Sequence, residues 1–352
     1  MATQRKFLSA LCSTCENLTS TLDYHEALRS VVEKAAQCLK AKASSIRLLD
    51  KTGKILESVA SWGLSRKYLQ KGLVALEKSP LDRAVLKGRI VQIRSMSTDK
   101  RIQYRAEAKR EGIASLLCVP LKVRGRMMGV LRIYTNKEHT FSPDEIVLIE
   151  TFAAQGAVVI KNSRRYGRLK TISEIGRRIA SQLDIASVLT MICEHATQDM
   201  SAKGASIMLI NRDTGRLEVV ATHGLSGRFT EKGPVIVDKS VCECLGGKEV
   251  VIEDASRDRR LQYPRALKSE GIKSLICIPL KLKGGMVGTL RVYIGYRYVY
   301  DREDLEFLNI LGDFGVVALE NARLYEHTKR AYEDLTEDVW KWYGWGTRQP
   351  KL

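Results

Sequence analysis

An internal repeat constrains the fold of this chain more than any other feature of its sequence. Residues 101–134 and 260–293 are identical at more than half of their positions, and residues 42–50 match residues 203–211, each followed by Thr-Gly. The copies are about 160 residues apart, a length at which a polypeptide can bury a core of its own. We therefore predict two copies of one domain that fill nearly the whole chain.

Apolar periodicity indicates the elements of one copy. A stripe of apolar residues predicts a helix over residues 6–19, and Asp23 is placed to cap a second helix. Apolar runs separated by turn residues predict strands that form hairpins. The predicted strands and short helices cover residues 45–49, 55–61, 81–86, 90–93, 99–110, 115–123 and 126–134. Consecutive hairpins with helices before and after them indicate an antiparallel sheet and the α+β class.

A helical pattern begins at Pro143 and continues to about residue 183. We expect one long connecting helix shared between domain 1 (residues 1–165) and domain 2 (residues 166–327), followed by an aromatic tail (residues 328–352). The helix carries an apolar seam that outruns its domain and therefore needs a partner. The seam comprises Phe152, Val159, Tyr166, Leu169, Ile172, Gly176, Ile179 and Leu183. We therefore predict a parallel homodimer along this helix.

The composition is that of a globular protein, with 44% hydrophobic and 28% charged residues, which excludes disorder as the main state. No apolar run approaches the roughly 18 residues of a membrane span, and the first residues lack the apolar block of a signal peptide. We therefore expect a cytoplasmic protein without a membrane span. Its eight cysteines should stay reduced there.

The net charge of +18 is concentrated in the first part of the chain. Residues 1–200 hold 34 basic and 19 acidic residues and so carry +15 of the total. Such an excess favours an anionic partner. We do not expect nucleic acid, because no zinc finger or RNA-binding motif is present and the segment 171–193, which faintly resembles a helix-turn-helix, recurs as the entry helices of the first copy.

Three marks give the chain a family resemblance. They are the hairpin sequence EGI-x-SLLCVPLKVRGRMMGVLRIY, present in two versions, the segment VVIEDASRDRR at residues 250–260 and the closing ENARLYE at residues 320–326. Over about residues 5–327 the chain resembles tandem GAF domains. The resemblance implies two six-stranded antiparallel sheets flanked by helices, each with a ligand pocket under loops, and a role in sensing small molecules.

The sequence departs from the better-defined GAF branches. Residues 101–114 and 260–273, where bilin-binding relatives attach their chromophore, contain no cysteine, so no covalent bilin is expected. The Asn-Lys-Phe-Asp-Glu signature of the cyclic-nucleotide branch is absent. The free methionine sulfoxide reductase branch is a single compact domain, whereas this chain is a tandem protein. The identity of the ligand therefore stays open.

We predict a sensory, bacterial-type regulatory protein rather than an enzyme. It would bind a small molecule in one or both pockets and pass the signal to a separate partner. The alternatives are a thiol-dependent reductase with the GAF fold and a non-sensing dimeric scaffold. The first pocket is the expected site for an anion, because its half of the chain carries most of the charge.

A basic loop supplies the main candidate ligand-binding residues. Arginine offers a planar fork for carboxylate or phosphate, glutamine a donor and an acceptor, and tyrosine a stacking face with a hydroxyl. The three types recur in register as Arg101, Gln103 and Tyr104 in the first copy and as Arg260, Gln262 and Tyr263 in the second. The alternative is a solvated helix start with the tyrosine packed beneath it.

Cysteine, histidine and tryptophan give weaker candidates. Cys242 and Cys244 are assigned to a pocket-side helix where the first copy has Leu81 and Arg83. Trp62 and His223 end equivalent strands near the expected pocket mouths. We expect neither haem nor a metal centre, because no histidines pair at ligand spacing and no second cysteine pair stands at zinc spacing.

The C-terminal tail is dominated by tryptophan. Trp340, Trp342 and Trp345 lie close together beside Tyr343, at the end of a predicted helix that has an acidic face and is stopped by Gly344 and Gly346. Exposed tryptophan is enriched at binding hot spots. The tail would fold back on the protein itself, dock on an effector protein or contact a membrane surface, and the acidic run disfavours the last of these.

Overall fold

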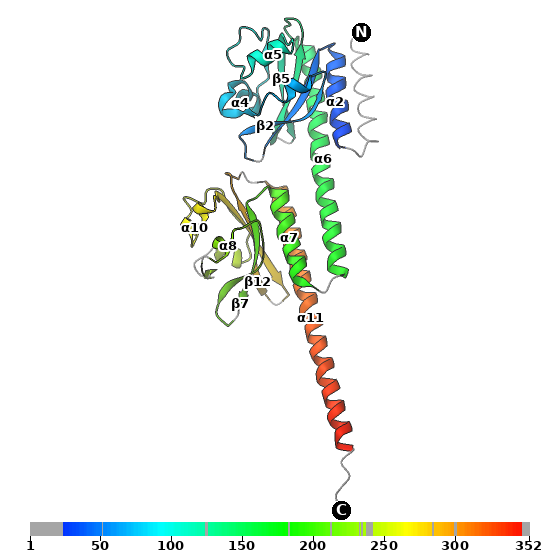
Figure 1. Ribbon diagram of the computed structural model, residues 1–352, viewed down its shortest axis with the longest axis vertical. Coiled ribbons are helices and arrows are strands. Elements are labelled where there is room, and N and C mark those ends of the chain that lie inside the picture. Colours follow the sequence, from blue (N-terminus) through cyan, green and yellow to red (C-terminus); the bar gives the residue numbers. More distant parts are fainter. Residues whose placement is uncertain are drawn as a thin grey trace, which may run out of the picture. The chain divides into compact units, whose positions relative to one another are not determined.

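The computed structural model divides into two compact units, residues 1–167 and 168–352 (Figure 1). The predicted helix over residues 6–19 and the predicted capping residue Asp23 lie outside the described residues. The side chains of Arg126, Cys242 and residues 340–346 also lie outside them. The structure describes residues 24–50, 52–123, 126–181, 184–211, 213–231, 233, 235–236, 242–283, 285–298 and 301–346.

The first unit is built on a six-stranded antiparallel sheet with the order β3-β2-β1-β6-β5-β4. Its strands are β1 (Ala43–Leu49), β2 (Ile55–Trp62), β3 (Val74–Ala75), β4 (Val91–Ile93), β5 (Ser115–Val123) and β6 (Arg126–Thr135). Its helices are α2 (Tyr24–Cys38), α3 (Arg66–Leu69), η1 (Leu76–Lys78), α4 (Pro80–Leu86), α5 (Arg105–Arg110) and the first part of α6 (Pro143–Ser181). The predicted hairpins are confirmed. The sequence did not predict β3, η1 and α3, because two to four residues carry no measurable periodicity.

The second unit repeats this topology with the strand order β10-β11-β12-β7-β8-β9. Its strands are β7 (Gly204–Asn211), β8 (Arg216–His223), β9 (Val235–Ile236), β10 (Val250–Ile252), β11 (Ser274–Leu282) and β12 (Gly285–Ile294). Its helices are α7 (Ile185–Met200), α8 (Gly227–Thr230), α9 (Cys242–Leu245), α10 (Pro264–Ser269) and α11 (Arg302–Gly346). The predicted α+β class with two six-stranded sheets is therefore confirmed.

Each face of the first sheet has its own core, because successive strand residues point to opposite sides. Helices α2 and α6 cover one face, and α4 and α5 lie over the other (Figure 1). The helix-side core includes Leu28, Val32, Ile46, Leu131 and Phe152. The opposite core includes Leu116, Cys118, Val130 and Tyr134. The second face is where short helices and loops leave room for a ligand.

The predicted long helix is confirmed as α6, but its apolar seam is not free. Phe152 is fully buried in the core of the first unit, and Ile172 and Ile179 pack against the core of the second. The prediction that this seam needs a partner is therefore wrong for these three residues, because the domains themselves cover them. The exposed large apolar residues of α6 are Val147, Val158, Tyr166 and Leu169, of which Tyr166 and Leu169 belong to the seam.

By length and apolar content, α6 is the one helix among the described residues that could cross a membrane. Its apolar residues include Leu148, Ile149 and Phe152, which pack against the first sheet. Core packing therefore accounts for this apolar content.

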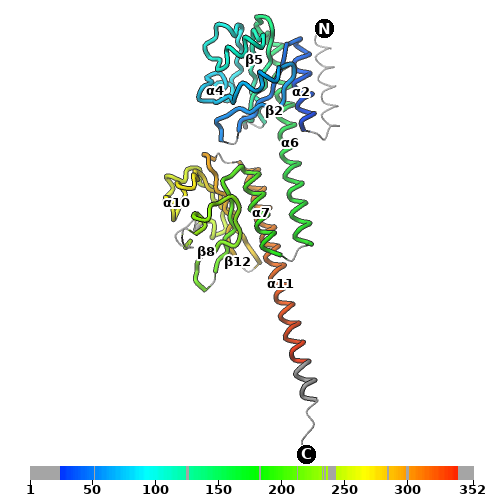
Figure 2. The backbone as a smooth tube through the Cα atoms, viewed as in Figure 1, coloured from blue at the N-terminus to red at the C-terminus, as the bar shows by residue number. Residues whose placement is uncertain are grey.

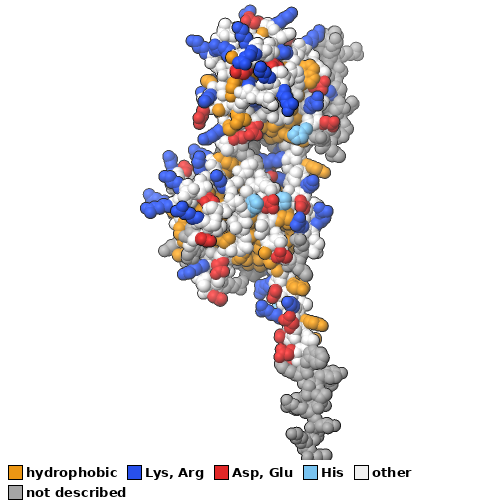
Figure 3. Space-filling model, viewed as in Figure 1, with side chains coloured by type: hydrophobic (Ala, Val, Ile, Leu, Met, Phe, Trp, Pro, Cys, Tyr) orange, Lys and Arg blue, Asp and Glu red, His pale blue; other side chains and the backbone are white. Residues whose placement is uncertain are grey.

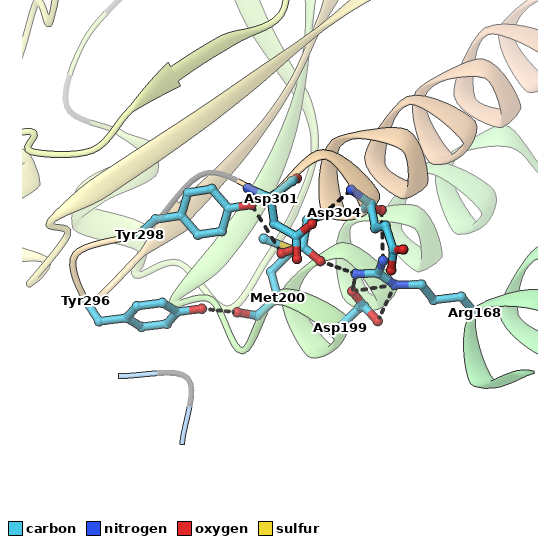
Figure 4. A network of polar contacts seen from close by, with 8 residues as sticks. Arg168, Asp199, Met200, Tyr296, Tyr298, Asp301 and Asp304 are labelled. Atoms are coloured by element: carbon cyan, nitrogen blue, oxygen red, sulfur yellow. Dashed lines mark hydrogen bonds and ion pairs between the residues drawn. The ribbon is translucent and has the colours of Figure 1, made fainter. Parts of the chain in front are cut away.

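A buried ion-pair network holds α6 to the second unit (Figure 4). The Arg168 guanidinium contacts Asp199 of α7 at 2.6 Å and Asp304 of α11 at 2.5 Å. It also donates to the carbonyl oxygen of Glu303 at 2.8 Å, while the Tyr298 hydroxyl donates to Asp304 at 3.1 Å. A guanidinium shared by two carboxylates fixes the geometry of three helices at one point.

Helix α11 runs from Arg302 to Gly346, so the closing segment 320–326 and most of the predicted tail form one helix. The coloured part of α11 in Figure 2 is one continuous coil. Its first turns are buried through Leu305, Leu308 and Leu311. Its exposed apolar residues are Ile310, Val317, Leu324, Tyr325, Tyr332, Leu335 and Val339. The side chains of Trp340, Trp342 and Trp345 lie outside the described residues.

Candidate functional site

A hollow opens on the first sheet, on the face opposite α2 and α6. The space that a water-sized molecule can enter is about 30 Å³. One water molecule needs about 10–15 Å³ on this measure, so the hollow has room for one or two waters or for a ligand of very few atoms. The lining includes Tyr68, Lys71, Asp82, Arg101, Gln103, Tyr104 and Arg132.

The strands place two arginines on the hollow side of the sheet. Ile46 of β1 belongs to the helix-side core, so its neighbours Ser45 and Arg47 point to the other face. Arg132 of β6 lies directly opposite Ser45 across the sheet and shares that face. Arg47 is 2% exposed and Arg132 is 7% exposed. A buried charge is costly unless it is paired, so the partners of these arginines decide what the site can do.

Arg132 has a carboxylate partner. Its Nη2 lies 2.5 Å from Oδ1 of Asp82, which the first turn of α4 presents. The Ser79 hydroxyl caps this helix and donates to the other oxygen of Asp82 at 2.6 Å. Burial alone would lower the pKa of Arg132, but the negative charge of Asp82 holds it above its usual range. This pair is electrically balanced and keeps α4 over the sheet.

Arg47 lacks such a partner within the described part of the chain. Its Nη1 donates to the carbonyl oxygen of Leu56 at 3.4 Å, and its Nε and Nη2 are buried without a hydrogen-bond partner. The Oε1 atom of Gln103, on the hollow, is buried and unpartnered as well. Each buried unsatisfied polar group costs about 1–3 kcal/mol, and native proteins contain only a few of them.

Lys71 brings a third cation to the hollow. Its Nζ donates to the carbonyl oxygen of Tyr68 at 3.0 Å and lies 3.5 Å from the centre of the Tyr68 ring. The ring centre of Tyr104 is 5.9 Å away. The ammonium group is therefore enclosed by two aromatic rings and one carbonyl group.

The surroundings of Lys71 lower its pKa. Burial is the main cause, with the positive charges of Arg47 and Arg132 adding to it, and together they lower the pKa of Lys71 to about 7. The carboxylates of Glu111 and Glu107 on and beside α5 act in the opposite direction. Near neutral pH the side chain of Lys71 is therefore about half protonated.

The loop before α5 closes the hollow from outside. Arg101 lines it, but its guanidinium is held by Asp99 at 2.5 Å and its side chain is 48% exposed. The Tyr104 hydroxyl donates to the carbonyl oxygen of Leu73 at 2.8 Å. A Cβ atom at Gly72 (φ +117°) would lie 2.8 Å from that hydroxyl, so only glycine fits there. These contacts give Arg101 and Tyr104 a clear role in holding the loop.

A comparison with known proteins identifies the family. Residues 21–161 and 182–320 each match the model of the GAF domain. These segments together make up more than half of the chain. The chain belongs to the GAF-domain family. Its two units are GAF domains in tandem.

Relatives of this tandem GAF protein are distant. The formate hydrogenlyase transcriptional activator of Salmonella typhimurium is 22% identical over 241 residues, which cover 62% of this chain and 35% of the relative. The chain thus matches about a third of that protein's length. A bacteriophytochrome from R. palustris shares the fold at 9% identity, with a TM-score of 0.53 over 90% of this chain and 76% of the other. The GAF domain of a phosphoenolpyruvate-protein phosphotransferase from Coxiella burnetii is 21% identical, with a TM-score of 0.42 over 46% of this chain and 96% of that domain.

The second GAF domain repeats the loop but changes its contacts. Arg260 is held by Asp258 at 2.5 Å and also by Glu243 at 2.7 Å. The Oε1 atom of Gln262 accepts a hydrogen bond from the backbone of Ile236 at 3.0 Å, unlike its counterpart in the first domain. Tyr263 sits beside Gly233, as Tyr104 sits beside Gly72. The sheet position of Arg47 is taken by Met208, so the second domain keeps the counterpart of Arg132, as Arg291, but not that of Arg47.

Other sequence-predicted residues lie in different places. Trp62, at the end of β2, packs against the helix-side core and does not line the hollow. His223 ends β8 opposite Ala205, and its contact with a ligand stays a prediction. Among the described residues, no group of three His, Cys, Asp or Glu side chains could hold a metal ion.

The pairing of the cysteine segment with the first copy was wrong. The backbone of Gly247 bonds to Cys244 as that of Gly88 bonds to Val85, so Cys244 stands in the place of Val85 rather than Arg83. The side chain of Cys242 lies outside the described residues.

Sequence reasoning missed four charged residues of the first site. They are the buried Arg47, Asp82 and Arg132 and the half-buried Lys71. A signal was present, because arginine interrupts an otherwise apolar strand in SSIRLL and again in VLRIY. A charged residue at a core-facing strand position marks either a buried pair or a ligand contact.

Proposed function

We propose that this protein is a regulatory sensor whose first GAF domain binds a small anion. The excess of cations at one hollow carries this proposal. Arg132 is paired with Asp82 and Arg101 with Asp99, which leaves the half-buried Lys71 and the buried Arg47 without a carboxylate in an ion pair among the described residues. The Lys and Arg side chains on the surface of the first unit would attract such a ligand (Figure 3).

The atoms without a hydrogen-bond partner indicate the chemistry of the ligand. The N–H groups of Arg47 would donate hydrogen bonds to carboxylate, phosphate or sulfate oxygens. The Oε1 atom of Gln103 calls for a donor. A small carboxylate that also carries an O–H or N–H group satisfies both, and the modest size of the hollow favours a ligand of few atoms.

A thiol-dependent reductase is the less favoured alternative for the first domain. Cys118 lies on the hollow side of β5, and burial raises its pKa to about 12. Its thiol is therefore protonated at neutral pH, whereas thiol catalysis needs the thiolate. A scaffold without a ligand would have no use for the excess of cations at the hollow.

The output is proposed to run through the helices to a separate protein. Exposed apolar residues on α6 and α11, among them Tyr166, Leu169 and Leu335, support a parallel homodimer along these helices. The end of α11, with Trp340, Trp342 and Trp345, is the proposed effector contact. The five cysteines whose side chains are described are free, which fits a cytoplasmic protein. Sedimentation of the full chain as a monomer at tens of micromolar would contradict the dimer.

The second domain suggests a variant with which anion binding in the first domain can be tested. In Arg47→Met the first domain receives the residue that the second domain carries at the same sheet position, as Met208. The full chain is heated with formate, acetate, lactate, sulfate or phosphate, at equal ionic strength set with sodium chloride. We expect at least one of these anions to raise the melting temperature of the natural chain and to lose this effect in Arg47→Met.

The control is Met208→Leu in the second domain, which should keep the full response to the anion. The unliganded Arg47→Met variant should melt no lower than the natural chain, because an unpaired buried charge has been removed. An anion response that survives Arg47→Met, or no response to any anion of the panel, would refute the proposed function.

A further inference from the structure

Two cysteines meet in the core of the second GAF domain. Cys244 of α9 and Cys277 of β11 are fully buried members of one apolar cluster. A hydrogen bond joins the two cysteine side chains. Both cysteines are free, so the two sulfurs are in contact without a bond between them.

An arginine makes the two thiols unequal. Arg291 of β12 lies directly opposite Cys277 across the sheet and is 5% exposed. The hydrogen bond with Cys244, together with the positive charge of Arg291, lowers the pKa of Cys277 against the opposing effect of burial. The same hydrogen bond and burial raise the pKa of Cys244. Because the thiolate is the nucleophilic form, the positive charge of Arg291 opposite Cys277 favours Cys277 as the attacking sulfur and Cys244 as the resolving thiol.

The first domain lacks this arrangement. Cys118 occupies the position of Cys277, but Val85 stands in the place of Cys244. The charge of Arg132 beside Cys118 is balanced by Asp82, and burial raises the pKa of Cys118 to about 12. The thiol pair is therefore a property of the second domain alone and is not required by the fold.

We propose that Cys277 and Cys244 form an oxidation site at which hydrogen peroxide closes a disulfide. The Cys277 thiolate attacks one peroxide oxygen, the O–O bond breaks, and the other oxygen takes up a proton and leaves as water. The resulting sulfenic acid is attacked by the sulfur of Cys244, the S–O bond breaks, and hydroxide leaves as water with the proton of Cys244. Two thiols are oxidised by two electrons, and one peroxide is reduced to two waters.

A disulfide between Cys244 and Cys277 would restrict the motion of α9. Helix α9 is only four residues long and packs on β11 and β12, so a bond from Cys244 would fix it to the sheet. Such a short helix opens locally at small cost, which admits an oxidant as small as peroxide. The second domain would then respond to oxidant with the face that corresponds to the anion site of the first.

Peptide mapping of the full chain tests the site directly. The reduced, desalted protein is treated with hydrogen peroxide, its remaining thiols are alkylated, and it is digested without reductant for mass spectrometry. We expect a peptide pair linked through Cys244 and Cys277. In Cys244→Ser, the sulfenic acid of Cys277 should persist and react with dimedone.

Cys118 serves as the internal control, because it has the same strand position without a thiol partner. It should stay reduced at peroxide concentrations that close the disulfide. Equal oxidation of Cys118 and Cys277, or an unmodified Cys277 when Cys38 is already oxidised, would overturn the proposal. Anion binding is not needed for this experiment, so the two proposals stand or fall separately.

Discussion

Anion binding in the first domain should weaken as pH rises through neutrality, because Lys71 loses its proton there. The pKa of Lys71 is about 7, lowered mainly by burial and further by Arg47 and Arg132 against Glu107 and Glu111. An anion in the hollow adds a negative charge and therefore raises this pKa. Below pH 7 the lysine is already charged and binding takes up no proton. Above pH 7 binding must take up a proton, and the apparent affinity falls.

The magnitude follows from the titration. With a pKa of about 7, roughly 90% of the Lys71 side chains are charged at pH 6 and roughly 10% at pH 8. The apparent affinity should fall about tenfold over this interval, which corresponds to about 1.4 kcal/mol. In the unliganded protein the sign of the effect on stability is opposite. A lysine whose pKa is lowered on folding makes the free energy of unfolding rise with pH between about 7 and its ordinary 10.5.

Isothermal titration calorimetry of the full chain measures this linkage. The ligand is the tightest-binding anion of the panel other than phosphate, whose own charge changes in this range. Titrations at pH 6, 7 and 8, in two buffers with different ionisation enthalpies, give both the affinity and the number of protons taken up. We expect uptake close to one proton at pH 8 and close to none at pH 6.

Two lysine variants separate the site from the general surface charge. Lys71→Met should bind weakly at pH 6 and lose the dependence on pH, whereas Lys67→Met, at an exposed position of α3, should keep it. An affinity of the natural chain that changes less than twofold between pH 6 and 8, with no proton uptake, would refute the reasoning.

Three further predictions concern stability, measured by urea unfolding of the full chain. Asp82→Asn should destabilise the first domain by about 3–5 kcal/mol, because it leaves the buried Arg132 uncompensated; an unchanged first transition would contradict this. Arg168→Ala should destabilise the second domain by a similar amount of about 3–5 kcal/mol, since two carboxylates lose their shared cation, and Arg168→Lys should recover part of the loss. Gly72→Ala should cost more than the roughly 1–2 kcal/mol of Gly53→Ala, because both residues have positive φ but only Gly72 faces a side chain; equal losses would count against the contact with the loop.

Periodicity predicted the elements whose length exceeds a few residues. The hairpins and α6 follow from apolar spacing, because burial of one strand face or one helix stripe leaves a direct imprint on the sequence. The site does not, because Lys71, in the loop between α3 and β3, and Arg132, on β6, are far apart in the chain and meet only in the folded domain. The same limit explains the misplaced cysteines. The interval from Gly72 to Gly88 is two residues longer than that from Gly233 to Gly247, and no periodic pattern marks where the difference lies.

The two copies provide a contrast that one domain alone would not. Both keep an arginine and a cysteine on adjacent strands, as Arg132 with Cys118 and Arg291 with Cys277. The two domains differ in the residue that contacts this pair. In the first domain the carboxylate of Asp82 on α4 contacts the arginine, and in the second the thiol of Cys244 on α9 contacts the cysteine. A GAF sheet folds with either, so the demands of folding do not choose between them. In the first domain the charge of Arg132 is balanced by Asp82, beside a cationic hollow, and in the second the charge of Arg291 stabilises the thiolate of Cys277. For this reason we assign a ligand to the first domain and an oxidant to the second.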